Sequence, residues 1–363
     1  MFAWRGSSGH EKQRPLGSSP PADANGMHHG GRSEVFFGHP PLSLVPAATV
    51  GASDNRGAFR SRFCAIMADH GSELAHARPC DEALHRLPNE VAAPPGPIPG
   101  QTSFAEVRLV VVPGIFGECV ARKVLPFQDA EVHLRERHGL PPVEWVPVSG
   151  RSSSAANAQK IAKWLTAHPT PAGRRLILLG YSKGATDLIE TIGRYPAAIP
   201  QGAAIVGVAP VVSGTPIADK GESLYLALAG VPFPGCQPGD EGGLSSLTRR
   251  ERVTWLAAHA LPPTLRYYSL PAFARKAKIS AALRPFYAQL ASHDERNDGQ
   301  VLFQDAIMPG SHILGYANAD HWAVTLPMRE GYPALSGLLN QNAYPRTVLL
   351  EAILQTVLED EPR

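Results

Sequence analysis

The sequence predicts an α/β fold built on a mostly parallel sheet flanked by helices. From residue 107 onward, short apolar runs alternate with longer amphipathic stretches, which is typical of strands joined by helical crossovers. The first run, VRLVVV at residues 107–112, is apolar and rich in β-branched residues, as strands covered on both faces are. Strands separated by helices in this way form parallel sheets with right-handed crossovers.

The predicted strands are five apolar runs and one shorter stretch that could form a last strand. They cover residues 107–112, 143–148, 174–180, 203–212 and 265–270, with 306–308 as the possible last strand. The predicted helices have apolar positions at helical spacing or good capping residues. They run roughly over 118–138, closed by Gly139, over a segment capped by Ser153 or Ser154, over 185–195 and over 346–358.

The first 100 residues differ in composition from the rest of the chain. They are rich in Gly, Pro, Ser and His and contain no sustained apolar period, so they bury too little apolar surface to offset chain entropy. We expect residues 1–100 to form a disordered tail, with 92–100 as a linker, and residues 101–363 to form the folded domain. His28 and His29 lie in this tail without further ligands nearby in the sequence, so we expect no metal site and no cofactor.

Charge and cysteine content narrow the possible partners and compartment. The chain has 34 basic and 32 acidic residues, a balance that gives no reason to expect nucleic acid or anionic lipid as a partner. No run approaches the roughly 18 apolar residues of a membrane span, and the start lacks the order of a signal peptide. Cys64, Cys80, Cys119 and Cys236 show no metal-ligand spacing. We interpret them as free thiols and expect a cytoplasmic protein.

Residues 180–184 read Gly-Tyr-Ser-Lys-Gly and match the pattern G-x-S-x-G. The pattern alone is short, but here it follows a predicted strand and opens a predicted helix, as a nucleophile elbow requires. The glycines allow the sharp turn, which holds the serine in a strained conformation at the positive end of a helix. Ser182 is therefore the candidate nucleophile.

A nucleophilic serine needs a base and an orienting acid, in the chain order Ser, Asp or Glu, His for this type of turn. His321, in the sequence ADHWA, is the candidate base, and Asp298, followed by Gly299, is the candidate acid. Asp320 is interpreted as a solvated residue or a supporting one, because adjacent side chains diverge. The alternatives are Asp294 and Asp305 for the acid, and His293 and His312 for the base.

An oxyanion hole would complete such a site. One N–H donor is that of the residue after the nucleophile, Lys183. The other is expected from the loop at residues 112–117, where Pro-Gly lets the backbone turn after the first strand. We expect this second donor to be Ile115, with Phe116 as the alternative. Each donor can contribute about 2.7–4 kcal/mol of transition-state stabilisation.

Taken together, VVVPGIFG, LLGYSKGATD, NDGQV and ADHW resemble an α/β-hydrolase of the bacterial lipase and esterase type over about residues 105–363. The resemblance implies that Ser182, Asp298 and His321 form the catalytic triad. It implies further that residues 213–263 are similar to the lid or cap segment of lipases. The chain departs from the family pattern at Pro113, Tyr181 and Lys183.

The expected function is hydrolysis of a carboxylic ester, small or lipidic, through an acyl-enzyme on Ser182. An acyltransferase or thioesterase could use the same residues, and a catalytically silent binding module could use the same fold. Apolar residues within 213–263 favour an apolar acyl group. They are Leu224, Leu226, Leu228, Val231 and Phe233. The sequence leaves the oligomeric state open.

Overall fold

A computed structural model describes most of the chain. The described residues are 51–93, 102–115, 117–121, 123–219 and 239–360, all within a compact unit formed by Pro40–Arg363. Among them, no helix has both the length and the apolar character needed to cross a membrane.

The described residues form a seven-stranded sheet in which every pair of neighbouring strands is parallel, in the order β1-β8-β6-β5-β4-β2-β3. Its strands are β1 (Ser53–Asp54), β2 (Val107–Val112), β3 (Glu144–Trp145), β4 (Arg175–Tyr181), β5 (Ala204–Val208), β6 (Arg266–Leu270) and β8 (His312–Ile313). A second, two-stranded sheet pairs β7 (Ala272–Phe273) with β9 (Ala317–Asn318).

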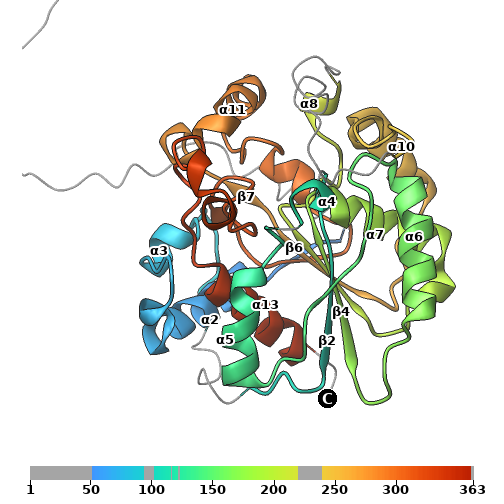
Figure 1. Ribbon diagram of the computed structural model, residues 1–363, viewed down its shortest axis with the longest axis horizontal. Helices are drawn as coiled ribbons and strands as arrows, with labels where there is room; N and C mark the ends of the chain where they lie inside the picture. Colours follow the sequence, from blue (N-terminus) through green and yellow to red (C-terminus); the bar gives the residue numbers. More distant parts are fainter. Residues whose placement is uncertain (1–50, 94–101, 116, 122, 220–238, 361–363) are drawn as a thin grey trace, which may run out of the picture. The chain divides into compact units, whose positions relative to one another are not determined.

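Long helices cover both faces of the larger sheet (Figure 1). One face carries α2 (Arg56–Asp69), α5 (Gln128–His138) and α13 (Arg346–Glu359), and the other carries α6 (Ser154–Ala167), α7 (Lys183–Arg194) and α10 (Arg249–Ala258). Strand β2 shows why two cores form. Val107, Leu109 and Val111 join the first core, whereas Val110 and Val112 join the second, because successive side chains of a strand point to opposite faces.

Shorter helices lie in the connections. The α-helical ones are α3 (Cys80–Ala83), α4 (Gly117–Val120), α8 (Pro216–Asp219), α11 (Arg284–Ala291) and α12 (Met328–Gly331). The 3₁₀ helices are η1 (Gly71–Glu73), η2 (Pro196–Ala198), η3 (Ser245–Leu247), η4 (Lys276–Lys278), η5 (Ala281–Leu283), η6 (Phe303–Ala306) and η7 (Pro333–Leu335).

The predicted fold class is confirmed, and most predicted elements are present. β2 has the predicted bounds, and β4, β5 and β6 lie within or beside their predicted runs. Ser153 caps α6 as expected, its side chain accepting a hydrogen bond from the Ala156 N–H at 3.2 Å. This contact satisfies one of the unpaired N–H groups of the first helical turn.

Two element predictions were wrong. The stretch 118–138 is not one helix but α4 and α5, because Pro126 interrupts it and Phe127 adopts a left-handed φ of 61°. The stretch 306–308 is not the last strand. The helix η6 ends at Ala306, the chain turns at Gly310 with φ 68°, and only then does β8 join the sheet.

The expectation of a disordered tail was wrong for residues 51–93. β1 pairs with β8, and Phe59, Phe63 and Ile66 of α2 are fully buried in the core that contains α13. Their spacing of four and three residues places them on one side of a helix. Composition averaged over 100 residues concealed these three apolar residues. The domain therefore begins before residue 101, while residues 1–50 lie outside the described part of the chain.

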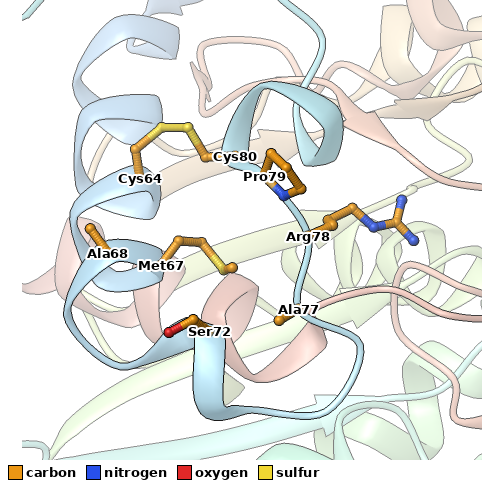
Figure 2. Close-up of a pocket in the computed structure, with 8 residues that line it drawn as sticks. All are labelled: Cys64, Met67, Ala68, Ser72, Ala77, Arg78, Pro79 and Cys80. Atoms are coloured by element: carbon orange, nitrogen blue, oxygen red, sulfur yellow. A yellow bond between two sulfur atoms is a disulfide. The ribbon is translucent and has the colours of Figure 1, made fainter.

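The expectation of free thiols was also wrong for the described cysteines. Cys64 of α2 and Cys80 of α3 form a disulfide, with an S–S distance of 2.08 Å (Figure 2). It borders a pocket of about 430 Å³ that Met67 and Arg78 also line. Cys119 is disulfide-bonded as well, and Cys236 lies outside the described residues. Because disulfides persist in oxidising compartments, the cysteines do not support a cytoplasmic location.

The segment 213–263, expected to resemble a lid, is only partly described. Its last helix, α10, belongs to the domain itself, because Trp255 is buried in the second core and packs against Gly193 of α7. Its first residues lie near the candidate acid, since the Thr215 hydroxyl donates to the Gln300 carbonyl at 2.7 Å. The five apolar residues that favoured an apolar acyl group lie outside the described residues.

Candidate active site

Ser182 lies at the sharp turn between β4 and α7. Its φ of 55° and ψ of −125° are rare for a residue other than glycine and mark a strained backbone. A Cβ on Gly180 would lie 2.4 Å from the Ala185 Cα, and a Cβ on Gly184 would lie 2.1 Å from the Val112 carbonyl oxygen. Both glycines are therefore required sterically, as the sequence pattern suggested.

The structure brings Ser182, His321 and Asp298 together. His321 Nε2 lies 2.8 Å from Ser182 Oγ, and His321 Nδ1 lies 2.7 Å from Asp298 Oδ2. All three residues are buried, with at most 4% of their surface exposed. An ionised carboxylate only accepts hydrogen bonds, so Nδ1 carries the proton and the Nε2 lone pair faces the serine hydroxyl. This is the tautomer that can accept the serine proton.

The loop of Asp298 explains why glycine follows the acid. Asp298 Oδ1 accepts hydrogen bonds at 2.8 Å from the N–H groups of both Gln300 and Val301, which closes a tight turn. Gly299 within this turn has a φ of 90°, a conformation that favours glycine. The N–H of His321 donates to the Asp298 carbonyl at 2.9 Å, so the two loops also meet through their backbones.

The alternative acids and bases have other partners or lie elsewhere. Asp305 pairs with Arg249 at 2.7 Å, and Asp294 pairs with Arg296 at 2.6 Å. His312 Nδ1 lies 2.7 Å from the Ser53 hydroxyl, on the far strands of the sheet. His293 is exposed just after α11. Among the described residues, Asp298 and His321 are the pair in line with Ser182.

Asp320 is not solvated but fully buried next to the candidate base. Its carboxylate accepts hydrogen bonds from the N–H groups of Ser280 at 2.9 Å, Trp322 at 3.1 Å and Ala323 at 2.8 Å. Burial raises the pKa of Asp320, the hydrogen bonds from Ser280 and Ala323 lower it, and the nearby Asp298 charge raises it further. Asp320 therefore shapes the loop that carries His321. Of the two interpretations that the sequence allowed, a solvated or a supporting residue, the structure agrees with the second.

Tyr181 is a positioning residue that the sequence analysis missed. Its buried hydroxyl donates to the His321 carbonyl at 2.9 Å, and the two rings lie 5.2 Å apart. The strand that presents the serine thus also holds the loop of the histidine. In the sequence, Tyr181 stood out only as a departure from the family pattern, because a contact between residues 140 positions apart leaves no local signal.

The side chain of Lys183 points away from the reacting groups into a buried polar network. Its Nζ lies 2.7 Å from Asp187 Oδ1, one helical turn later, and neither side chain is exposed by more than 1%. Asn157 donates to Asp187 Oδ2 at 2.8 Å and to the Ser149 carbonyl at 2.8 Å. Burial raises the pKa of Asp187, whereas the Lys183 charge lowers it. This network accounts for the uncommon lysine.

The expected oxyanion loop lies against the serine. A Cβ on Gly114 would lie 2.9 Å from the Ser182 Cβ and 3.3 Å from its Oγ, so this glycine permits the close approach. Ile115 follows Gly114, and Lys183 provides the first residue of α7. Phe116, the alternative donor, lies outside the described residues. The donor roles of Ile115 and Lys183 stay predictions.

The parallel sheet and the strand–Ser182–helix turn define an α/β-hydrolase. The chain is 42% identical to the metagenomic carboxyl esterase MGS0156, covering 88% of this chain and 97% of that one with a TM-score of 0.81. The propeptide form of lipase BlEst2 from Bacillus licheniformis is 17% identical, with coverage of 72% and 52% and a TM-score of 0.53, a likeness of fold alone. No protein-family model and no curated protein sequence matches.

The chain therefore belongs to the esterase and lipase family of α/β-hydrolases, which are carboxylic ester hydrolases. The coverage also bears on the domain boundary. Residues 101–363 are 263 of the 363 residues, fewer than the 88% that the similarity to the esterase covers. The similarity must therefore include residues before 101, in agreement with the folded segment 51–93.

Proposed function

We propose that the protein hydrolyses carboxylic esters through an acyl-enzyme on Ser182, with His321 as the base and Asp298 as the orienting acid. The observation that carries this proposal is the continuous pair of short contacts, 2.8 Å from Ser182 Oγ to His321 Nε2 and 2.7 Å from His321 Nδ1 to Asp298 Oδ2. A silent binding module would have no need for this alignment on a strained turn.

In the acylation step, Ser182 Oγ attacks the ester carbonyl carbon while its proton passes to His321 Nε2. The carbonyl oxygen becomes an oxyanion, for which the N–H groups of Ile115 and Lys183 are the proposed donors. When the tetrahedral intermediate collapses, the bond to the alkoxy oxygen breaks, and the histidine returns its proton to the leaving alcohol. Asp298 stabilises the imidazolium in between.

Deacylation repeats the sequence with water as the nucleophile. His321 takes a proton from the water, whose oxygen attacks the acyl carbon, and then returns it to Ser182 Oγ as the acid product leaves. The start of α7 at Lys183 adds the positive end of a 12-residue helix next to the developing charge.

The test is Ser182→Ala, compared with the wild type for labelling by a fluorophosphonate and for turnover of p-nitrophenyl esters. Alanine removes the nucleophile but keeps the Cβ that this turn already accommodates, so the melting temperature should stay close to that of the wild type. Labelling should disappear. Turnover should fall by several orders of magnitude, leaving at most the ~10³–10⁴-fold acceleration over water that binding and the oxyanion donors provide.

A Ser182→Ala protein that is still labelled, or that retains most of its ester turnover after exclusion of contaminating esterase, would show that the nucleophile is another residue. A series of acyl-chain lengths on the wild type then tests the substrate class. Preference for longer chains would support an apolar acyl group, as the composition of residues 213–263 favours.

A further inference from the structure

A second cluster of reactive side chains lies apart from Ser182, where α2, α5 and α13 pack together on one face of the sheet (Figure 1). His70 follows the end of α2, His133 belongs to α5 and Glu351 to α13. One ligand atom from each lies within 4.8 Å of the other two. His70 and Glu351 are buried, and the His133 side chain is 25% exposed. None of them contributes to the proposed ester hydrolysis.

The hydrogen bonds of His70 determine which of its nitrogens has a lone pair. His70 Nδ1 lies 2.9 Å from Asp69 Oδ2, and a carboxylate only accepts hydrogen bonds, so this nitrogen carries a proton. In the neutral ring, the Nε2 lone pair then faces Glu351 Oε2 at 2.9 Å. Two facing electron pairs repel, so a positive charge is required there, either a second proton or a metal ion.

Ring nitrogens of two further histidines lie near the same carboxylate. His133 Nε2 is buried without a hydrogen-bond partner, 4.0 Å from Glu351 Oε2. His138 Nδ1 lies 2.9 Å from the Thr102 carbonyl oxygen, which can only accept, so this nitrogen is protonated too. Its Nε2 is fully buried and lies 3.0 Å from Glu351 Oε1, an ion-pair distance when the ring carries a second proton. A single cation between His70, His133 and Glu351 would satisfy the two histidine lone pairs near Oε2 at once.

We propose that this cluster binds one divalent transition-metal ion of the Zn²⁺ type, through His70 Nε2, His133 Nε2 and a Glu351 carboxylate oxygen. Tetrahedral ligands at 2.0–2.1 Å from zinc lie about 3.3–3.4 Å from one another. The separations of 2.9 and 4.0 Å from Glu351 Oε2 to the two histidine nitrogens bracket this value. Imidazole ligands favour zinc and its neighbours over calcium or magnesium.

The surroundings are those of a supported metal site. Asp69, which holds His70 Nδ1, is itself bound by Arg137 at 2.6 Å, so a carboxylate–histidine pair orients the first ligand. Gln355 Nε2 donates to Glu351 Oε1 at 3.1 Å and fixes the carboxylate. The metal would link α2, from the N-terminal segment, to α5 and α13. Its proposed role is therefore to stabilise the fold, at a place where the sequence analysis expected no metal.

The experiment uses the full chain, stripped with a chelator and then titrated with Zn²⁺ alone. We expect uptake of one equivalent by calorimetry and elemental analysis, a higher melting temperature with the metal, and visible absorption bands of low-symmetry Co²⁺ when cobalt replaces zinc. His133→Ala should abolish stoichiometric uptake, and its partly exposed position makes the substitution compatible with folding. Glu351→Gln should do the same, with circular dichroism as the check on folding.

Two variants make the result specific. Asp69→Asn removes only the carboxylate that orients His70 and should weaken Zn²⁺ binding by about 10–100-fold. His168→Ala removes an exposed histidine outside the cluster and should bind Zn²⁺ like the wild type, as should Ser182→Ala. No uptake by the wild type, or equal losses in His168→Ala and His133→Ala, would overturn the proposal. Either result would indicate a protonated His–Glu cluster or adventitious surface binding instead.

Discussion

At the scale of single residues, the turn around Ser182 leaves no space for side chains on its two glycines. A methyl group at Gly184 would overlap the Val112 carbonyl oxygen at 2.1 Å, so the backbone of β2 or α7 must move to accept it. The same backbone carries the proposed nucleophile and the loop proposed to supply an oxyanion donor. We therefore expect stability and catalysis to depend on the same few atoms.

We therefore expect Gly184→Ala to lower the free energy of unfolding by about 1–3 kcal/mol, the usual cost of overpacking, and to reduce kcat strongly in the molecules that still fold. Urea unfolding and ester kinetics measure the two effects. Gly337→Ala is the matched control, because it is exposed and a Cβ there has no atom within 4 Å. Equal stability of the two variants would contradict the steric role of Gly184.

Lys183 has two separable roles at this scale, a proposed N–H donor and a buried side-chain cation. Lys183→Met keeps the N–H but leaves Asp187 buried without its cation. We expect a loss of about 3–5 kcal/mol in unfolding free energy, with a smaller change in kcat per folded molecule. The double variant Lys183→Met with Asp187→Leu should recover much of the stability. If kcat falls as steeply as in Ser182→Ala, the side chain takes part in catalysis.

At the scale of elements, η6 and the start of α10 are joined by a partly buried ion pair. Arg249 opens α10 and contacts Asp305 of η6 at 2.7 Å, and the Asp305 carbonyl accepts hydrogen bonds from Val212 and Ser213. Burial raises the pKa of Asp305 to about 6, although Arg249 opposes the shift. The protonation of Asp305 should therefore affect how firmly the start of α10 is held to η6.

The sign of this pH effect follows from the raised pKa. The folded state holds the Asp305 proton more tightly than the unfolded state, so the contribution to stability is greatest below about pH 4 and is lost as the pH rises through about 6. The difference in unfolding free energy between wild type and Asp305→Asn should accordingly change by about 1–3 kcal/mol between those values. Urea unfolding at several pH values measures it. A difference independent of pH would contradict the raised pKa.

At the scale of the whole molecule, the N-terminal segment and the C-terminal helix complete one core. Phe59, Phe63 and Ile66 of α2 pack with α13, and the Cys64–Cys80 disulfide links α2 to α3. Large buried side chains contribute about 2–5 kcal/mol each, whereas a whole domain is stable by only about 5–15 kcal/mol. Without this segment, the apolar face of α13 would be exposed to water.

We expect deletion of residues 1–93 to prevent stable folding, while deletion of residues 1–50 should leave the melting temperature and esterase activity nearly unchanged. The second expectation still depends on the composition of those residues, which favours no core. Soluble yield, circular dichroism and thermal unfolding of the two truncations provide the comparison. A folded, active protein that lacks residues 1–93 would contradict the role assigned to α2.

The sequence by itself determined the parallel sheet, the turn at Ser182, and the selection of Asp298 and His321 as candidate acid and base. Each leaves a local signal: β-branched apolar runs for strands, glycines flanking the serine, and Gly299 after the acid where φ is 90°. These signals are local because they reflect the backbone of a few consecutive residues.

Only the tertiary structure decided the rest. Four features depend on residues that are far apart in the chain. They are the contact of Tyr181 with His321, the burial of Asp320, the folding of residues 51–93 and the cluster around Glu351. The physical reason is that burial and long-range pairing belong to no single segment. The arginines between Phe59 and Phe63 make α2 polar on average, and only packing against α13 shows which of its sides is apolar.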